Sequence, residues 1–254
     1  MNEKEKKNLK RFNKLFPWFA GLSSDLLFWV AIDTLFLTVV KKFTASQIVS
    51  LTSISLIACI LLQMPLLNII KKIGNTKSVR LGSMFLLLSS ILLTFGTDYI
   101  IIVIGKICYE TAFTFQNMIN AVLRNNLELQ GKTNEYIKYR TNANTIYAVV
   151  TMIISFVASI MFNINNYLPM FICLGFIIIS TILSSRFEDI YEVKQEKNNS
   201  SGLIPTLKEY KQDLKTTFRF ILKSKRMKAF ILFQIVFYSL ISIIDTYNGD
   251  FLTD

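Results

Sequence analysis

Histidine is absent from this chain of 254 residues, and the residues that build catalytic or metal centres are sparse. Without histidine, zinc sites lose a common ligand and nucleophilic triads lose their usual base. The three cysteines, Cys59, Cys108 and Cys173, lie in separate apolar runs without metal-ligand spacing, which predicts core thiols. No Gly-rich nucleotide-binding loop is present either. We therefore expect no cofactor, no metal site and no enzymatic activity.

Charged residues are also few, and they are unevenly placed. They make up 18 % of the chain, whereas 52 % of its residues are hydrophobic. A soluble domain usually carries about 25 % charged residues. Here the charges gather in short clusters between long runs that are apolar all round, as a bilayer demands because charge is costly in hydrocarbon. The pattern predicts an all-α membrane protein.

The apolar runs predict about seven transmembrane helices, since a crossing takes about 20 residues. The predicted spans are 17–40, 45–70, 79–96, 99–123, 143–162, 168–185 and 229–244. The predicted organisation is a basic cytoplasmic tail at 1–16, a six-helix bundle at 17–186, a cytoplasmic linker at 187–228, the seventh helix at 229–246 and an external tail at 247–254.

The linker contains a further predicted helix with two unlike sides. Leucine and phenylalanine recur on one side, at Leu203, Leu207, Leu214, Phe218 and Leu222. Basic residues form the other side, at Lys208, Lys211, Lys215 and Arg219. Such a helix is expected to lie on the inner leaflet, attracted by anionic lipid. The alternative is an ordinary solvated helix.

The placement of the basic residues behind the net charge of +11 indicates how the chain is oriented in the membrane. Basic residues flank the apolar spans and do not form one continuous face, so nucleic-acid binding is not expected. Nearly all of the 28 Lys and Arg residues fall in the N-terminal tail and the even-numbered connections, whereas the intervening connections hold only Lys41 and Lys42. Because basic residues stay on the cytoplasmic side, the N-terminus is predicted to be cytoplasmic. We expect a multi-pass protein of the inner (cell) membrane, with the lipid bilayer as its surroundings.

Five ionisable residues lie within the predicted spans. They are Asp25 and Asp33 in the first, Lys106 and Glu110 in the fourth, and Asp245 near the outer end of the seventh. An ionisable residue inside a membrane is a functional-site hypothesis by default. The alternative is that these charges only hold helices together.

Four of these charged residues can be grouped by their spacing along the chain and by their depth in the membrane. Asp25, Trp29 and Asp33 repeat every four residues, which predicts one helix face. Lys106 and Glu110 are also four apart. Asp33 and Lys106 each lie about two turns, or roughly 10 Å, below the predicted outer boundary. We therefore expect Asp33 and Lys106 to pair across a central cavity, with Asp25 and Glu110 deeper.

The connection between the second and third spans carries a family resemblance. Residues 71–80 read K-K-I-G-N-T-K-S-V-R. This resembles the short cytoplasmic loop of the major facilitator superfamily, whose usual form is Asp-Arg-x-Gly-Arg-Arg. Gly74 matches, Lys72 takes the place of the arginine, and Arg80 follows. Lys71 replaces the aspartate, so the charge-relay role of that position is not carried over.

Other segments extend the resemblance. Gly105 and Lys106 stand where the family often has Gly-Arg, an arginine linked with substrate or proton handling. Residues 115–127 and 135–140 are similar to the end of the fourth span and the loop after it. Six spans followed by a long basic connection match the six-plus-six layout. The fifth span lacks the Gly-rich motif of drug–proton antiporters.

The resemblance implies a secondary transporter that moves a small solute by alternating access, driven by an ion or solute gradient and possibly by protons. Asp33, Glu110 and Asp25 would then carry protons or substrate charge, and Lys106 would be their partner. Family members usually have twelve spans. The chain is therefore expected to be part of a longer protein, or to act as a homodimer if it ends at residue 254. The alternative function is a non-transporting or degenerate membrane protein.

Overall fold

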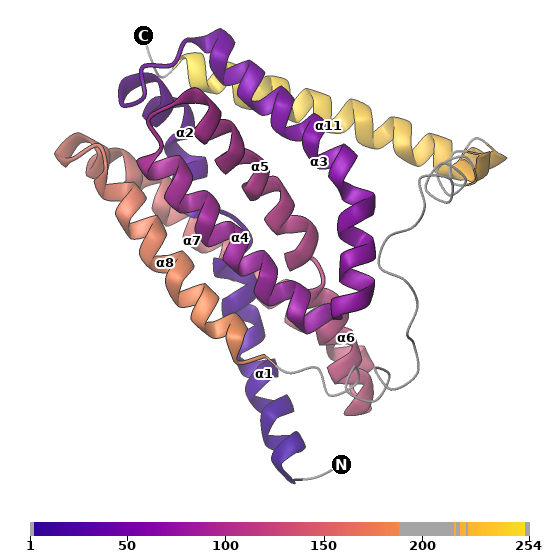
Figure 1. Cartoon of the computed structure of the whole chain (residues 1–254). Helices are drawn as coiled ribbons and strands as arrows, with labels where there is room; N and C mark the ends of the chain where they lie inside the picture. Colours follow the sequence, from indigo (N-terminus) through magenta and orange to yellow (C-terminus); the bar gives the residue numbers. More distant parts are fainter. Residues whose placement is uncertain (1–2, 188–215, 217–218, 222, 252–254) are drawn as a thin grey trace. The chain divides into compact units, whose positions relative to one another are not determined.

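The computed structural model describes residues 3–187, 216, 219–221 and 223–251 (Figure 1). The regular secondary structure of these residues is helical, as predicted. The chain forms two units, Met1–Leu203 and Ile204–Asp254. The first unit holds α1 (Glu3–Leu22), α2 (Leu27–Val39), α3 (Ala45–Ile73), α4 (Asn75–Phe95), α5 (Tyr99–Gln116), α6 (Ile119–Leu129), the short 3₁₀ helix η1 (Thr133–Glu135), α7 (Tyr136–Ile164) and α8 (Leu168–Ser185). The second unit holds α11 (Lys225–Phe251).

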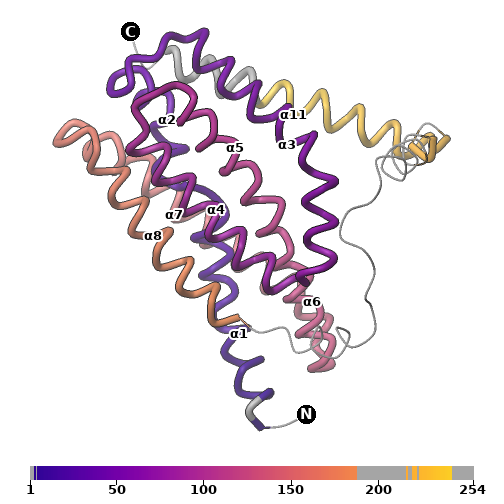
Figure 2. Tube along the Cα trace, in the orientation of Figure 1, coloured from indigo at the N-terminus to yellow at the C-terminus, as the bar shows by residue number. Residues whose placement is uncertain are grey.

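The first unit is an up-and-down bundle. In Figure 2, α1 and α2 run away from the N-terminus, α3 returns, α4 runs out again, and α5 with α6 returns. α7 and α8 then repeat the outward and return passes. Each pass overlaps one of the six spans predicted between residues 17 and 186.

Two short connections show why the chain turns where it does. Thr44 begins α3 with a capping box, in which its side chain accepts from the Gln47 backbone and the Gln47 side chain accepts from the Thr44 backbone. Gly74 ends α3 and begins α4 at φ +83° and ψ 165°. Only glycine adopts that region readily, so the glycine of the loop motif is explained by the corner that it forms.

Five helical stretches are long and apolar enough to cross a membrane, which indicates a multi-pass membrane protein. These stretches are Glu5–Val39, Ala45–Ile73, Asn75–Phe95, Thr133–Ile164 and Leu168–Ser185. α5, which carries most of the predicted fourth span, is not among them, because Lys106 and Glu110 offset its apolar residues. α11 contains the predicted seventh span and continues to Phe251, but its side chains are described only through Ile241.

α4 lies between α5 and α8 (Figure 1). Its contact with α5 is close at Gly82, where a Cβ atom would come within 2.9 Å of the Ala112 carbonyl oxygen. Ser89 strengthens the same contact, because its hydroxyl donates to the Gly105 carbonyl at 2.8 Å. Cys173 is buried in the adjoining core as a free thiol, whereas Cys59 and Cys108 are only half-buried.

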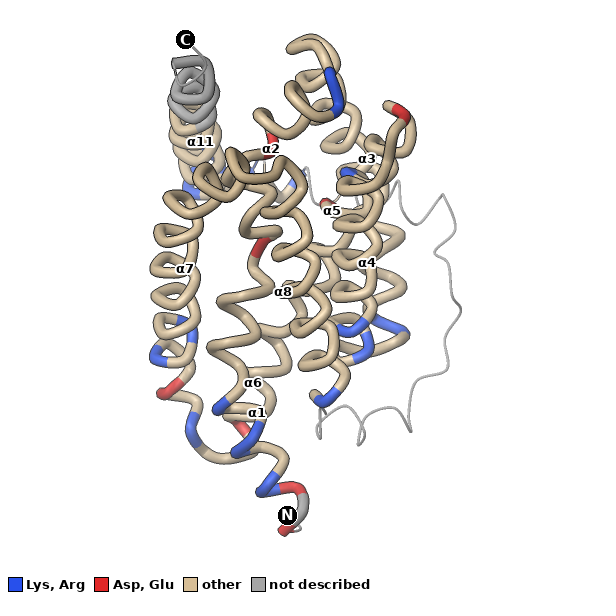
Figure 3. The backbone as a smooth tube through the Cα atoms, turned by 90° about the vertical axis from the view of Figure 1, so that its left-hand side faces the viewer, with Lys and Arg blue, Asp and Glu red and all other residues tan. Residues whose placement is uncertain are grey.

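Basic residues gather at the end of the first unit that carries the N-terminus (Figure 3). Lys71 and Lys72 lie in the last turn of α3 at this end, where a positive charge complements the helix dipole. The distribution agrees with the positive-inside pattern of the sequence.

Two predicted spans differ from the structure. The first is interrupted at residues 23–26, between α1 and α2, and α2 has a second distortion at Ile32, with φ −141° and ψ 18°. The fourth is interrupted by a turn at Asn117 and Met118 between α5 and α6. Hydropathy is insensitive to such breaks, because a few polar residues hardly change the average over a crossing. The predicted surface helix of the linker lies largely outside the described residues.

Candidate functional site

The break in the first pass is the centre of the candidate site. It falls within the apolar stretch Glu5–Val39, between Leu22 and Leu27. Two serines fold back onto the end of α1: the Ser23 hydroxyl donates to the Phe19 carbonyl at 2.7 Å, and the Ser24 hydroxyl bonds the Ala20 carbonyl. Serine side chains of this kind make a helix break tolerable at membrane depth.

Asp25 lies in this break, just before α2. Its Oδ1 atom accepts from the Leu26 backbone N–H at 2.8 Å and from the Tyr109 hydroxyl. The N-terminal end of a helix favours a negative charge, so the start of α2 stabilises this carboxylate. Both hydrogen bonds go to Oδ1, which leaves Oδ2 for a proton or a cationic group. The predicted single helix face through residues 25, 29 and 33 is therefore wrong for Asp25, because Asp25 precedes the helix.

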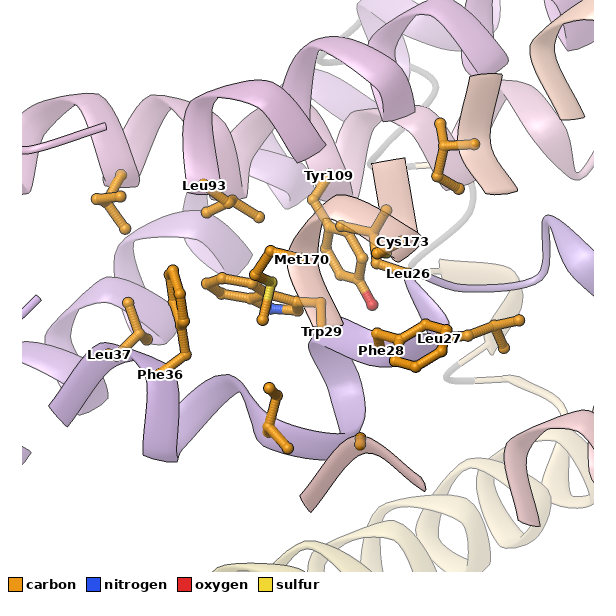
Figure 4. Close-up of a cluster of buried hydrophobic side chains, with 14 of the residues drawn as sticks. Leu26, Leu27, Phe28, Trp29, Phe36, Leu37, Leu93, Tyr109, Met170 and Cys173 are labelled. Carbon is orange, nitrogen blue, oxygen red and sulfur yellow. The ribbon is translucent and has the colours of Figure 1, made fainter. Parts of the chain in front are cut away.

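Tyr109 links the break to α5. Its side chain is 7 % exposed and reaches from α5 towards the start of α2 (Figure 4). Sequence reasoning missed this residue. The available signal was its position between Lys106 and Glu110, which places it on the same stretch of helix as two charges.

Lys106 and Glu110 form an ion pair within α5, with 3.7 Å between Lys106 Nζ and Glu110 Oε1. Their side chains keep 15 % and 20 % of their exposure. The Lys106 ammonium also lies over the Tyr109 ring, 4.1 Å from its centroid, which is cation–π geometry. The predicted common face of Lys106 and Glu110 is thus confirmed, and Lys106, Tyr109 and Asp25 form a continuous series of contacts.

Asp33 lies in α2, next to the distortion at Ile32. Its Oδ1 accepts from the Thr34 backbone N–H at 2.6 Å and from the Thr34 hydroxyl at 3.2 Å. The expected Asp33–Lys106 ion pair does not form: among the described residues, Lys106 is paired with Glu110. The charge of Lys106 nevertheless acts on both Asp33 and Asp25, so all four ionisable groups belong to one electrostatic cluster.

Trp29 contributes a polar atom to the same region. Its side chain is 2 % exposed, and its ring packs edge-on against Phe36 at 5.9 Å between centroids (Figure 4). Its Nε1 donor has no hydrogen-bond partner among the described residues. An unpaired buried donor costs about 1–3 kcal/mol, so the site retains an unused hydrogen-bond donor in the first turn of α2, the helix that Asp25 precedes.

The charge balance limits what this cluster can do. Asp25, Asp33 and Glu110 supply three carboxyl groups, and Lys106 supplies one ammonium group. In a bilayer such an excess of carboxylates is costly unless it is neutralised. Protons or a cationic group would neutralise it, so the arrangement favours proton uptake or cation binding.

The residues of the loop motif lie apart from this cluster. Lys72 is in the last turn of α3, and Gly74 forms the corner after it. Arg80, in α4, donates from Nη2 to the Phe187 carbonyl at 2.6 Å and so ties α4 to the end of α8. Asp245 belongs to α11, in the second unit, and its side chain lies outside the described part of the chain.

The functional proposal rests on this geometry, because three comparisons with known proteins found no match. No protein-family model, no curated protein and no solved structure matches the chain.

Proposed function

We propose that this chain belongs to a proton-linked secondary transporter of the inner membrane. It would contribute a six-helix bundle of the major facilitator kind, with α5 as its fourth span, and a seventh span in α11. A small solute would cross by alternating access. The observation that carries the proposal is the Asp25 carboxylate, which lies in a helix break within a membrane pass and is bonded to Tyr109 of another pass.

A broken membrane helix supports transport more than a purely structural role. Transporters bind substrates and coupling ions where a discontinuous helix exposes its backbone ends near the middle of the membrane. Here the start of α2 presents the Leu26 N–H to Asp25. The Oδ2 atom of Asp25 and the Nε1 atom of Trp29 remain for a proton or a solute.

The excess of carboxyl groups supports proton linkage. A proton on Asp25 would reduce the negative charge of the cluster. The Tyr109 hydroxyl would then donate its hydrogen bond to a neutral carboxylic acid in place of a carboxylate. The Lys106 ammonium, held by Glu110 and the Tyr109 ring, would respond to that change. The coupling group and the solute-binding groups would then share one hydrogen-bond network.

The alternative is a non-transporting membrane protein. The Lys106–Glu110 pair supports it, because two charges four residues apart on one helix can neutralise each other without any substrate. The same experiment decides between the two functions.

The experiment uses proteoliposomes that contain the full chain and an internal pH-sensitive dye. A panel of cationic, neutral and anionic solutes is added without a pre-set gradient, and proton movement is recorded. The parent should move protons with at least one solute, and both Asp25→Asn and Tyr109→Phe should lower that signal. Asp98→Asn is the matched control, because Asp98 is exposed between α4 and α5. A parent that responds to no solute contradicts transport and favours the alternative.

A fluorescence measurement tests the protonation step itself. The chain has 2 tryptophans, and Trp18 is 56 % exposed whereas Trp29 is buried in α2, four residues after Asp25. In the Trp18→Phe protein, the fluorescence emission of Trp29 should change over the pH range in which the carboxyl groups of the cluster gain or lose protons. Adding Asp25→Asn should remove that change, and adding Asp98→Asn should preserve it. Identical titrations in all three proteins would exclude Asp25 as the proton carrier.

A further inference from the structure

A pocket of about 480 Å³ lies in the first unit, where α1 meets the end of α8. Asn8, Arg11, Phe12 and Leu15 line it from α1, and Arg186 and Phe187 line it from the end of α8. Asn8 and Leu15 each lie three or four residues from both Arg11 and Phe12, so the four α1 residues share one helix face. The α1 residues of the pocket lie in the first two thirds of that helix, and no residue of the Asp25 cluster lines the pocket.

Two arginines give the pocket its charge. The side chains of Arg11 and Arg186 are exposed, and neither guanidinium forms an ion pair or a hydrogen bond within the described ranges. Other arginines are engaged: Arg80 bonds the Phe187 carbonyl, and Arg140 donates to Asn120 Oδ1 at 2.7 Å. The pocket therefore presents two available guanidinium groups.

The apolar part of the pocket lining is well fixed. Phe187 is 2 % exposed and packs edge-on against Phe12 and Phe19, with centroids 5.1 Å and 4.8 Å apart. The hydrogen bond from Arg80 fixes the Phe187 carbonyl from the side of α4. Leu15 extends this lining along α1 towards the membrane pass. Charge and apolar surface are thus held side by side by contacts among α1, α4 and the end of α8.

We propose that this pocket binds the phosphate-bearing headgroup of an anionic phospholipid. Arginine recognises phosphate through paired N–H groups in a planar fork. A bare phosphate ion would fill only a small part of a pocket of about 480 Å³. A phospholipid headgroup supplies the anion together with the glycerol, which would fill more of the pocket and lie against the half-buried Leu15 and the edges of the packed rings of Phe12 and Phe187.

The position of the pocket supports a lipid as the source of the phosphate. Basic residues are concentrated at this end of the unit, which the positive-inside pattern places at the cytoplasmic leaflet (Figure 3). That leaflet carries the anionic lipids, and basic pockets between membrane helices on this side hold such headgroups. The inference does not depend on transport, because the pocket residues take no part in the Asp25 cluster.

Native mass spectrometry of the full chain in detergent tests the site with phosphatidylglycerol as the probe and phosphatidylcholine as the neutral comparison. The parent should retain phosphatidylglycerol in preference to phosphatidylcholine. The double variant Arg11→Gln/Arg186→Gln should weaken phosphatidylglycerol binding by about tenfold or more, because each basic residue near an anionic surface contributes about 1 kcal/mol. Each single variant should give an intermediate loss.

The matched control is Lys10→Gln/Arg124→Gln, which removes the same charge from exposed positions that do not line the pocket. It should bind phosphatidylglycerol like the parent. An equal loss in both double variants would overturn the proposal in favour of diffuse surface charge. Displacement of the lipid by millimolar inorganic phosphate would instead identify a free phosphate site and overturn the lipid source. A parent that does not distinguish the two lipids would overturn the site altogether.

Discussion

α3 and α4 are consecutive helices of similar apolar character, but they occupy different environments. Both are long and apolar enough to cross a membrane. Half of the most apolar stretch of α4 is buried in the protein, compared with 17 % of that of α3. Large apolar side chains such as Val49, Ile57 and Ile60 remain exposed along α3, as expected of a surface that faces lipid.

Small side chains explain the difference. The buried face of α4 carries Gly82, Ser83, Ser89 and Ser90. Small residues let helix backbones approach closely, and membrane helices associate through such packing and through interhelical hydrogen bonds. The comparison teaches that hydropathy locates a membrane helix, whereas the pattern of small residues within it locates the face that packs closely against a neighbouring helix.

The largest effect is expected from Gly82→Leu in α4. A Cβ atom at this position would come within 2.9 Å of the Ala112 backbone carbonyl, so α4 and α5 would have to separate. Overpacking of this kind should cost about 3 kcal/mol or more, measured as thermal unfolding in detergent. The matched control is Ser53→Leu on the exposed side of α3, which should change stability by less than about 0.5 kcal/mol. Equal losses would contradict the close-contact explanation.

A smaller effect is expected from Lys41→Met, at the far end of α4. The Lys41 ammonium donates to the Thr94 and Gly96 carbonyls at 2.8 Å and 2.7 Å, and so caps the C-terminus of α4 from the α2–α3 connection. Losing these charge-assisted bonds should cost about 1.5 kcal/mol. The neighbouring Lys42 is exposed, so Lys42→Met should unfold like the parent. If the two variants unfold at the same temperature, the capping contact makes no net contribution to stability.

The smallest effect is expected from Ser89→Ala, which removes the hydrogen bond from α4 to the Gly105 carbonyl of α5. Interhelical hydrogen bonds in membrane proteins average about 0.6 kcal/mol. The control Ser155→Ala removes an exposed hydroxyl of α7 that bonds only its own helix, at the Thr151 carbonyl, and should have almost no effect. Chemical unfolding curves of both variants against the parent resolve the difference. A larger loss for Ser155→Ala would reverse the comparison between interior and lipid-facing helices.

Part of the candidate site could be predicted from spacing alone. Lys106 and Glu110 are four residues apart on one helix, and the helical repeat brings them together whatever the rest of the chain does. The expected pairing of Lys106 with Asp33 failed, because equal depth in the membrane does not fix the direction in which two helices point their side chains. The distortion at Ile32 changes that direction for Asp33.

The break at residues 23–26 left only a weak signal in the sequence. Ser23, Ser24 and Asp25 are residue types that bond nearby backbone and favour turns. An apolar average over a whole crossing conceals three such residues. The contact of Asp25 with Tyr109 had no signal in the spacing at all, because it joins residues 84 positions apart.

The sequence by itself determined that the chain is helical, where its membrane passes run and which end carries the positive charge. These properties follow from local hydrophobicity and charge, which the bilayer selects residue by residue. Only the tertiary structure decided that α4 packs between α5 and α8, that the first pass is broken at Asp25, and that Arg11 and Arg186 flank one pocket. Each of these depends on contacts between residues distant in the chain, and packing between helices sets them because the bilayer does not distinguish one apolar helix from another.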